Sequence, residues 1–446
     1  MPPRPEPVSQ PSPRPAAAPA ARTRRPPRAA APVAAPQAAP VAAASVARPC
    51  RPPLSPGGRL LLNPGMPTTT ADRLPRPTPF LALDVATMRH NIAAMQERAA
   101  AVGADLRPHV KTHKCLEIAR LQVQAGARGI TVATVSEAEA FAQAGFDDIF
   151  IAYPLWVDAA RGERLARLAE RVALRVGCDS VEAAAALGRH VAPGIGHGVA
   201  QGARPEVLVE VDSGMGRTGV PPREAGAVAL ALARAGLTPV GVFTFPGHSY
   251  APAGREAAAD DERRALGEAA ESVAATGVCG ERPLVVSGGS SPSVGFARPG
   301  GPVTELRPGV YVVQDAQQWE LGACGAGDIA LTAYATAVSH AGGRVVLDAG
   351  TKVLGADRPA YASGNGRLLD HPQARIVSAS EHHAVVELPA GEAPPPLGSV
   401  VRVVPNHACN AINLADELWV IGDRPQPVGA GVFEGSWRVA ARNAND

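Results

Sequence analysis

Between residues 104 and 313, short apolar segments alternate with alanine-rich helical segments, and this alternation most constrains the fold. A continuous apolar strand followed by a helix is typical of a parallel sheet covered by helices on both sides. One helical segment spans residues 136–145, and another ends at Gly236, a usual helix stop. Eight such strands over about 210 residues predict a (β/α)8 barrel. The predicted strands span residues 104–111, 129–135, 148–154, 171–177, 205–212, 239–245, 282–289 and 304–313.

The pattern changes after residue 315, where short strands are separated by turns rich in glycine and proline. These strands span residues 331–339, 344–350, 384–388, 399–404 and 417–421. They predict a mostly antiparallel β domain, with an extension of the barrel's own sheet as the alternative. Upstream of the barrel strands, residues 78–84 predict a further short strand that leads into an amphipathic helix. We therefore expect a barrel domain at residues 76–314 and a β domain at residues 315–446.

Residues 1–75 differ in composition from the rest of the chain. The first 65 hold 18 of the 45 prolines and nine arginines, against one acidic residue, Glu6. Such a segment cannot bury enough apolar surface to fold, so we expect it to be disordered. It is either a functional basic arm or transit peptide, or sequence upstream of a true start at Met66. The second is favoured, because the proline density opposes the amphipathic helix of a transit peptide.

The charge of the folded part excludes some classes of partner. Residues 1–65 carry +8 and the whole chain +2, so the remainder carries −6 and gives no argument for binding nucleic acid. No apolar stretch of about 18 residues predicts a membrane span. The six cysteines are scattered and form no C-x-x-C pair, which favours a reducing cytoplasmic location.

Two segments far apart in the chain carry residue types suited to catalysis. Lys111 ends the first predicted barrel strand, in R-P-H-V-K-T-H-K, and barrel active sites form at the carboxyl ends of strands. A lysine there can hold an aldehyde cofactor as a Schiff base, with Lys114 as the alternative. Near the C-terminus, V-P-N-H-A-C-N-A-I-N-L places His407 two residues before Cys409, a pair that can ligate zinc. A structural zinc site needs four ligands, so two protein ligands favour an open, catalytic site.

Together these segments resemble the D-serine dehydratase / D-threonine aldolase family, pyridoxal 5'-phosphate (PLP) enzymes of the alanine-racemase-like fold. The resemblance covers about residues 76–440. It implies that Lys111 carries PLP and that His407 and Cys409 hold a metal ion beside it, zinc or alternatively manganese. It also implies a small D-amino acid substrate and a homodimer.

Two glycine-rich loops follow predicted barrel strands. In S-G-G-S-S-P-S, amides freed by the glycines and the adjacent hydroxyls can form an anion site. This favours Gly288, Gly289 and Ser290 as ligands of the cofactor phosphate. The loop V-D-S-G-M-G-R-T-G-V resembles the racemase D-T-G-M-x-R-x-G loop, which brings Arg217 towards the barrel mouth as a substrate candidate.

The segment L-R-P-G-V-Y resembles the racemase R-x-G-x-x-Y pattern. The resemblance implies that Arg307 faces the pyridine nitrogen, with Gly309 and Tyr311 also at the cofactor, although the tyrosine stands one residue closer to the glycine than in that pattern. An arginine does not give its proton to the ring, so a leaving group needs help elsewhere, such as from a metal. His248 and Tyr153 follow two other strands and are candidates for the cofactor and the substrate, respectively.

The predicted reaction is the β-elimination of a D-3-hydroxy amino acid, such as D-serine, to a 2-oxo acid and ammonia. The alternative is retro-aldol cleavage, as in D-threonine aldolase, to glycine and an aldehyde. Members of the aldolase branch tend to have aspartate where Cys409 stands, which favours the dehydratase. A metal-free racemase lacks support because its second base, usually a C-terminal-domain tyrosine, is not found. A PLP-homeostasis protein is a single barrel, which residues 315–446 oppose.

Overall fold

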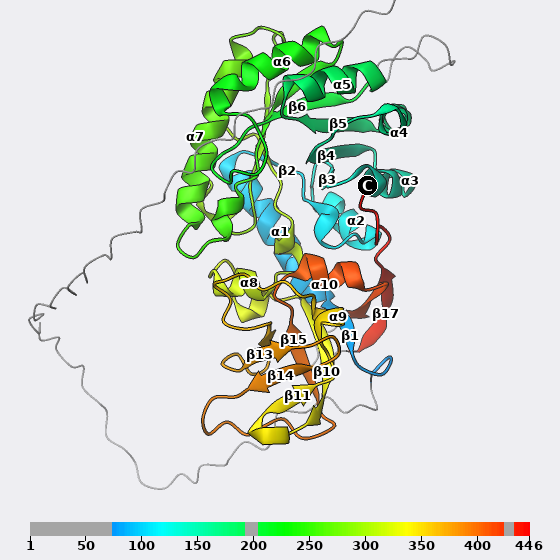
Figure 1. Ribbon diagram of the computed structural model, residues 1–446, viewed down its shortest axis with the longest axis vertical. Helices are drawn as coiled ribbons and strands as arrows, with labels where there is room; N and C mark the ends of the chain where they lie inside the picture. The colour runs from blue at the N-terminus through cyan, green and yellow to red at the C-terminus, as the bar shows by residue number, and fades with distance from the viewer. Residues whose placement is uncertain (1–73, 192–203, 423–431) are drawn as a thin grey trace, which may run out of the picture. The chain divides into compact units, whose positions relative to one another are not determined.

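The computed structural model describes residues 74–191, 204–422 and 432–446, and two β-sheets organise them (Figure 1). The predicted disordered tail falls almost entirely on residues 1–73, outside the described residues. No helix within the described ranges is both long and apolar enough to cross a membrane.

The first sheet has eight parallel strands in the order β2-β9-β8-β7-β6-β5-β4-β3. A parallel bridge between His109 and Thr131 joins β2 to β3, so the two edges of the sheet meet. The predicted (β/α)8 barrel is thereby confirmed, and each of the eight predicted strands overlaps one of the observed strands. The strands are β2 (Asp105–Leu106), β3 (Ile130–Val132), β4 (Asp148–Pro154), β5 (Ala173–Cys178), β6 (Glu206–Glu210), β7 (Thr238–Phe243), β8 (Val285–Gly288) and β9 (Glu305–Leu306).

Helices cover this sheet, and local capping explains where several of them begin. The Thr134 hydroxyl accepts from the Glu137 amide at the start of α3, and the Asp158 carboxylate accepts from the Arg161 amide at the start of α4. Gly236, with φ of 76°, follows α6 as predicted. The helices are α1 (Val85–Val102), α2 (Leu116–Gln124), α3 (Val135–Gln143), α4 (Ala159–Ala169), α5 (Val181–Val191), α6 (Ala225–Arg234) and α7 (Arg255–Ala274).

The second sheet is mixed but mostly antiparallel, as predicted for the C-terminal region. Its main path runs β13-β14-β11-β10-β1-β16-β17, with β15 paired to β10 and β12, and its parallel pair is β1–β16. The strands are β1 (Phe80–Asp84), β10 (Leu331–Ser339), β11 (Val345–Leu347), β12 (Arg367–Leu368), β13 (Arg375–Ala379), β14 (Ala384–Glu387), β15 (Val400–Val404), β16 (Glu417–Ile421) and β17 (Phe433–Arg438).

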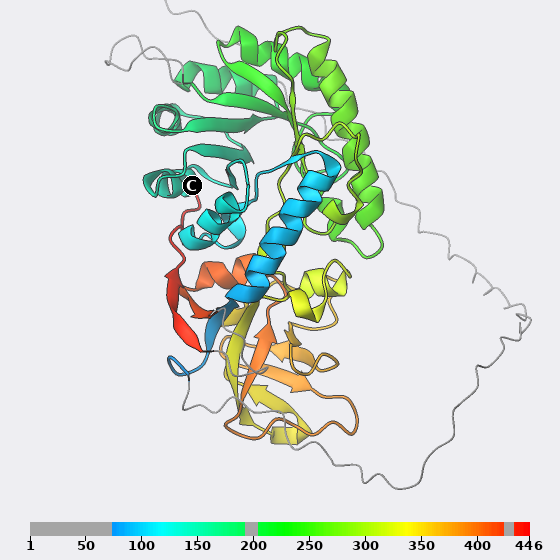
Figure 2. The same cartoon turned by 180° about the vertical axis from the view of Figure 1, so that it is seen from behind.

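Strand β1 belongs to this second sheet, although it precedes all of the barrel in the sequence. Its Phe80 ring stacks on Tyr334 at 5.3 Å between centroids and meets Trp419 and Phe433 edge-on. The alternate residue Leu81 is buried in the core on the other face of the sheet. From β1 in the second sheet the chain crosses through α1 into the barrel, as Figure 2 shows.

Three short helices follow the barrel strands in sequence: α8 (Ala316–Glu320), α9 (Thr351–Leu354) and α10 (Ala408–Leu414). Helix α10 lies against the carboxyl end of β2, because the Cys409 thiol in its first turn is 3.4 Å from the Thr112 hydroxyl. The Ala408 amide donates to the buried Asp315 carboxylate at 3.0 Å, which fixes the start of α10 next to α8. The C-terminal region therefore contributes side chains to the mouth of the barrel.

Candidate active site

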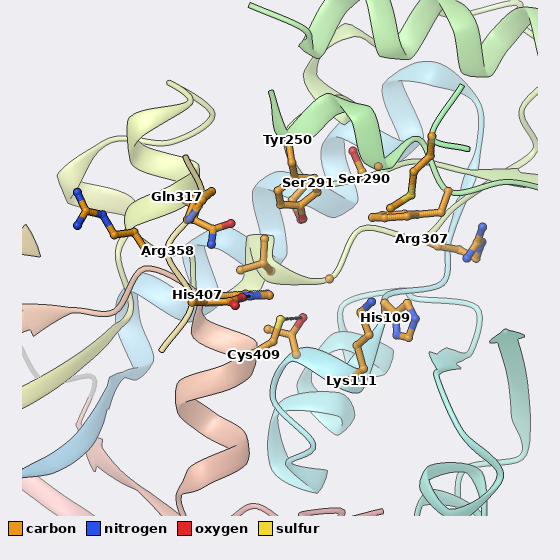
Figure 3. A pocket seen from close by; sticks show the side chains of 18 residues that line it. His109, Lys111, Tyr250, Ser290, Ser291, Arg307, Gln317, Arg358, His407 and Cys409 are labelled. Atoms are coloured by element: carbon orange, nitrogen blue, oxygen red, sulfur yellow. Dashed lines mark hydrogen bonds and ion pairs between the residues drawn. The ribbon is translucent and has the colours of Figure 1, made fainter. Parts of the chain in front are cut away.

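A cavity of about 430 Å³ lies at the carboxyl ends of the barrel strands (Figure 3). Residues of both the barrel and the C-terminal region line it. This is the place where barrel enzymes hold their reacting groups. The lining residues are His109, Lys111, Thr112, Met215, Phe245, Gly247, Tyr250, Ser290, Ser291, Arg307, Gly309, Val310, Gln317, Asp357, Arg358, Pro359, His407 and Cys409.

Lys111 stands in a short 3-10 turn (Val110–Thr112) directly after β2, and its side chain enters the cavity. Its Nζ lies 5.6 Å from the centroid of the Phe245 ring, and within the described residues it has no carboxylate partner. Burial lowers the pKa of the Lys111 ammonium, the charge of Cys409 opposes that shift, and the charge of Arg217 adds to it. A lysine in these surroundings supplies a neutral, nucleophilic amine more readily than one in solvent.

Lys114, the alternative lysine, has its own partners outside the cavity. Lys114 is buried, and its Nζ forms an ion pair with Glu137 at 3.2 Å and donates to Asn413 at 3.0 Å. Those contacts tie the start of α2 to α3 and α10, and Lys114 does not line the cavity. Of the two lysines considered from the sequence, only Lys111 reaches the cavity.

The guanidinium of Arg307 closes the inner end of the cavity. Its Nε donates to the Ser287 hydroxyl at 2.8 Å and its Nη2 donates to the Thr244 carbonyl at 2.6 Å. The rings of Phe150 and Phe243 lie under it, with centroids at 5.4 and 5.1 Å. These contacts fix the guanidinium as a rigid donor.

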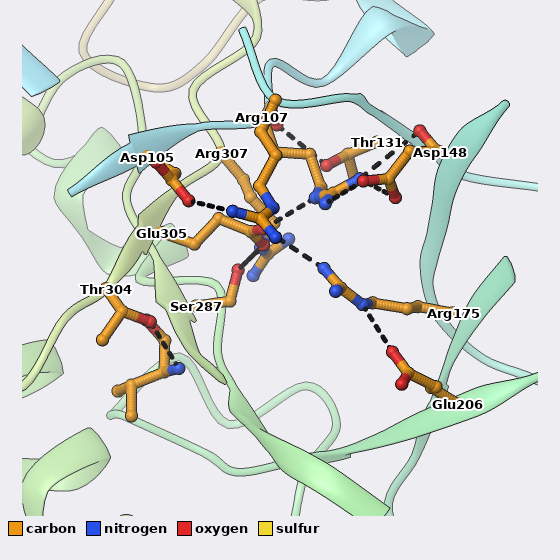
Figure 4. Close-up of polar contacts among 12 residues, drawn as sticks. Asp105, Arg107, Thr131, Asp148, Arg175, Glu206, Ser287, Thr304, Glu305 and Arg307 are labelled. Carbon is orange, nitrogen blue, oxygen red and sulfur yellow. Dashed lines mark hydrogen bonds and ion pairs between the residues drawn. The ribbon is translucent and has the colours of Figure 1, made fainter. Parts of the chain in front are cut away.

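Behind Arg307, a buried network of charged groups fills the barrel interior (Figure 4). The Ser287 hydroxyl donates to Glu305 at 2.7 Å, and the same carboxylate accepts from Arg107 Nε at 2.7 Å. Arg107 also donates from both terminal nitrogens to Asp148, at 2.6 and 3.0 Å. Burial lowers the pKa of Arg307, and the negative charge of Glu305 opposes that shift.

A wall rich in hydroxyls forms another side of the cavity. The Ser290 hydroxyl lies 2.8 Å from that of Ser249, while the Ser291 hydroxyl accepts from the Tyr311 amide at 3.0 Å and keeps its own proton to donate. Burial raises the pKa of the Tyr250 phenol well above its ordinary value, so this side chain is a neutral donor. Hydroxyls beside the backbone at Gly309 make a surface that suits an anion such as a phosphate.

His407 and Cys409 line the same cavity as Lys111, and the Cys409 thiol lies 3.4 Å from the hydroxyl of Thr112, the residue after Lys111 (Figure 3). His407 Nδ1 pairs with the Asp357 carboxylate, which orients the imidazole. Burial alone would lower the pKa of His407, but Cys409, Asp315 and Asp357 raise it to about 10. Burial alone would raise the pKa of the Cys409 thiol, but His407 and Lys111 lower it. A thiol whose pKa is lowered in this way, beside an imidazole, can lose its proton to bind a metal ion.

The described residues hold no group of three or more histidine, cysteine and acidic side chains placed to bind one metal ion. His407 and Cys409 therefore form a two-donor site, which leaves coordination positions for water or a substrate.

Four predicted residues lie away from the cavity lining, each for a physical reason. His248 Nε2 faces Asp261 of α7 at 3.3 Å. The Tyr311 ring is buried, and its hydroxyl accepts from the Gln122 amide at 2.9 Å. Tyr153 is 52% exposed. The exposed Arg217 lies beside the cavity, with its guanidinium 5.3 Å from the Phe245 centroid.

The two glycines predicted to bind phosphate also lie behind the cavity wall. The Gly289 amide donates to the buried Glu262 carboxyl group, and Gly288 packs against that same group. The predicted Ser290, Arg307 and Gly309 do line the cavity, together with Lys111, His407 and Cys409.

Sequence reasoning missed several lining residues. Phe245 and Ser291 stand in segments already singled out, at the end of the sixth predicted strand and in the serine-rich loop, so a fuller reading of those segments could have found them. Gln317 and residues 357–359 come from the C-terminal region, and no motif or period in the sequence distinguishes them.

Comparisons with known proteins agree with this architecture. The model of the alanine racemase N-terminal domain matches residues 83–317, and that of a putative serine dehydratase domain matches residues 330–421. The chain is 36% identical to the D-threo-3-hydroxyaspartate dehydratase of Delftia sp. (strain HT23), over 74% of this chain and 90% of that protein. It is 34% identical to a D-threonine aldolase of Arthrobacter sp, over 85% of this chain and 95% of that protein.

Solved structures give the same relationship. The Delftia dehydratase matches with a TM-score of 0.71 and 33% identity, over 82% of this chain and 97% of that one. Two mutant structures of that enzyme carry alanine for a histidine and for a cysteine two positions later, and the cysteine mutant is in a metal-free form. The chain therefore belongs to the alanine racemase-like, fold-type III family of PLP-dependent enzymes, and it is a lyase of the dehydratase and aldolase branch.

Proposed function

We propose that this protein is a PLP- and zinc-dependent dehydratase that converts a D-3-hydroxy amino acid, such as D-serine, to a 2-oxo acid and ammonia. The observation that carries the proposal is the pair His407 and Cys409, which lines the same cavity as Lys111. A soft thiolate and an imidazole favour zinc, whereas a carboxylate in place of the thiolate favours manganese.

The cavity offers a partner for each functional group of PLP. Lys111 would attach the aldehyde carbon through Nζ, because it is the lysine that reaches the cavity without a carboxylate partner. Ser290, Ser291 and the backbone at Gly309 would hold the phosphate, and Arg307 would face the pyridine nitrogen. When bound, PLP supplies an electron sink for the negative charge that develops at the substrate α-carbon.

His407 and Cys409 would hold the metal, and Asp357 would keep the imidazole in one orientation. The spacing of these two residues equals that of the histidine and cysteine replaced in the Delftia dehydratase mutants, one of which is metal-free. A bound zinc ion supplies Lewis acidity, which makes a hydroxyl group a better leaving group.

Protein side chains would carry out the proton transfer and control the charge on the cofactor ring. Lys111 Nζ, whose ammonium pKa is lowered by burial, accepts the α-proton of the substrate in its neutral form. Arg307, held by Ser287 and the Thr244 carbonyl, keeps its proton and so limits charge delocalisation into the ring. That limit favours loss of the β-hydroxyl together with the α-proton over a long-lived carbanion, and it makes the donor pair His407 and Cys409 necessary.

A second candidate is retro-aldol cleavage of a D-3-hydroxy amino acid to glycine and an aldehyde. It is favoured by the 34% identity to a D-threonine aldolase, which extends over 85% of this chain. The same donors would serve it, with the β-hydroxyl losing its proton instead of leaving the substrate.

Product analysis separates the two candidates. The purified protein is incubated with D-serine and with D-threonine, with and without added zinc or manganese, and the Lys111→Ala variant serves as the control. Pyruvate from D-serine in the presence of zinc supports elimination. Glycine plus acetaldehyde from D-threonine, without 2-oxo acid from either substrate, would assign the aldolase reaction instead.

A further inference from the structure

Helix α7 carries one ionisable residue within an otherwise apolar buried stripe. Its buried side chains are Ala258, Glu262, Ala265, Leu266, Ala269 and Val273. These positions follow helical spacing, and alanine or leucine at position 262 would complete the stripe. A buried carboxyl group at this position destabilises the fold unless it has a hydrogen-bond partner, because burial removes its hydration.

Glu262 is 6% exposed and reaches the serine-rich loop that lines the cavity. Its Oε1 accepts a hydrogen bond from the Gly289 amide. Gly288 makes room for this contact, since a Cβ there would lie 2.3 Å from the same oxygen. Gly288 and Glu262 therefore pack against each other, and a side chain at position 288 would displace the carboxyl group from its present place.

The contact sets the direction of the loop. Gly289 takes φ of 89°, in the left-handed region that favours glycine, and its amide points away from the cavity towards α7. The next two residues, Ser290 and Ser291, then line the cavity. Without an acceptor at Glu262, the Gly289 amide would be buried and unpaired, so the turn would lose its anchor.

From this geometry we propose that Glu262 is a positioning residue for cofactor phosphate binding, holding Gly289 so that Ser290 and Ser291 face the phosphate, and that it acts as the neutral acid when the phosphate is bound. The inference rests on the proposed function, because it needs a phosphate at this wall.

The charges around Glu262 explain why its protonation would matter. A bound phosphate and an ionised Glu262 would repel each other across one turn of the loop. Burial raises the pKa of Glu262 to about 7, and the Gly289 hydrogen bond and the charge of Arg307 oppose the shift. On its other side, a small cavity brings Glu262 together with Arg263 of its own helix and Arg298. The acid is thus neutral below about pH 7 and ionises above it, which is the direction that weakens phosphate binding.

The test compares PLP with pyridoxal, which lacks the phosphate. The cofactor is removed from the wild-type protein and from Glu262→Ala, Glu262→Gln and Glu268→Gln, and each ligand is titrated back by absorbance. Glu268 is an exposed residue on the same helix, so it controls for the chemical change. We expect Glu262→Ala to raise the dissociation constant for PLP about tenfold and to leave that for pyridoxal within twofold. Glu268→Gln should match the wild-type protein with both ligands.

The glutamine variant tests the charge, because it keeps an acceptor oxygen but cannot ionise. At pH 6 it should bind PLP as the wild-type protein does, and at pH 8.5 it should bind PLP more tightly. Equal pH profiles for Glu262→Gln and the wild-type protein would overturn the inference, as would equal losses of PLP and pyridoxal in Glu262→Ala. If Glu262→Ala does not fold, the pH dependence of PLP binding by Glu262→Gln is by itself the test of the inference. A wild-type protein that binds no PLP would instead refute the proposed function.

Discussion

Replacing Arg107 with methionine should destabilise the protein far more than the same change at a surface arginine. The Arg107 side chain is fully buried and donates three charge-assisted hydrogen bonds, one to Glu305 and two to Asp148. Burial alone would lower the pKa of Arg107, but the charges of these carboxylates raise it, so the group is a cation in the folded protein. Methionine keeps an unbranched apolar stem but is shorter, and it removes the guanidinium with its donors and its charge.

The magnitude follows from what each partner retains. The Asp148 side chain is 23% exposed and can recover water. The Glu305 side chain is only 4% exposed and keeps Arg175 at 3.5 Å as a weaker partner. Removing one member of a buried ion pair costs about 3–5 kcal/mol. We expect a loss near 3 kcal/mol, because Arg175 offsets part of the uncompensated charge at Glu305.

The assay is urea denaturation followed by far-UV circular dichroism, with the shift in midpoint converted through the measured slope. Arg128→Met is the matched control, because Arg128 and its partner Asp105 are 57% and 53% exposed. An exposed pair of this kind contributes about 0–1 kcal/mol. If Arg107→Met costs no more than Arg128→Met, the buried network does not hold the barrel together and the reasoning is wrong.

Three further predictions concern the cavity and its surroundings. Lys111→Ala should abolish the PLP adduct that borohydride traps, and an unchanged adduct would show that PLP is attached to another lysine. Treatment with a chelator, or Cys409→Ala, should stop turnover while PLP absorbance and the fold persist; full activity in metal-free protein would contradict a metal-assisted reaction. Burial lowers the pKa of His113 to about 4, below the value near 6.5 expected when unfolded, so its contribution to stability falls as pH drops from 6.5 towards 4. Between pH 7.5 and pH 5, urea titrations should show a drop in the free energy of unfolding that is about 2 kcal/mol smaller for His113→Gln than for the wild-type protein. Equal drops in the two proteins would contradict the role given to His113.

The sequence was most informative where a residue's place on a strand decides its role. Lys111 was predicted to end a strand and lies in the turn that follows β2, and every strand of a parallel barrel ends at the same mouth, so its position followed from the alternation of strands and helices. His248 also follows a strand, yet Asp261 on α7 draws it away, and no spacing in the sequence reveals that partner. Prediction from strand ends therefore finds candidates but does not orient their side chains.

The glycine-rich loop shows a second limit. Gly288 and Gly289 match an anion-binding pattern, but the structure turns the Gly289 amide to Glu262, about 27 positions upstream in the chain. Strand β1 shows a third, because the alternation in F-L-A-L-D suits either sheet, and only the aromatic contacts of Phe80 with Tyr334 and Phe433 select the second. In both cases a contact between residues far apart in the sequence selects one of two local arrangements that the sequence pattern fits equally well.

The place of β1 has a consequence for biosynthesis. Leu83 pairs with Leu331, so this strand leaves the ribosome long before its neighbours β10 and β16 are made. In the sequence, the barrel is inserted between β1 and the other strands of the second sheet. The barrel strands can therefore pair with one another during synthesis while the backbone amides and carbonyls of β1 are still unpaired. A fragment beginning at residue 315 would lack the strand between β10 and β16, and a barrel fragment that retains β1 would display an unpaired edge. The two parts are thus contiguous in space but not separable by a single cut in the chain.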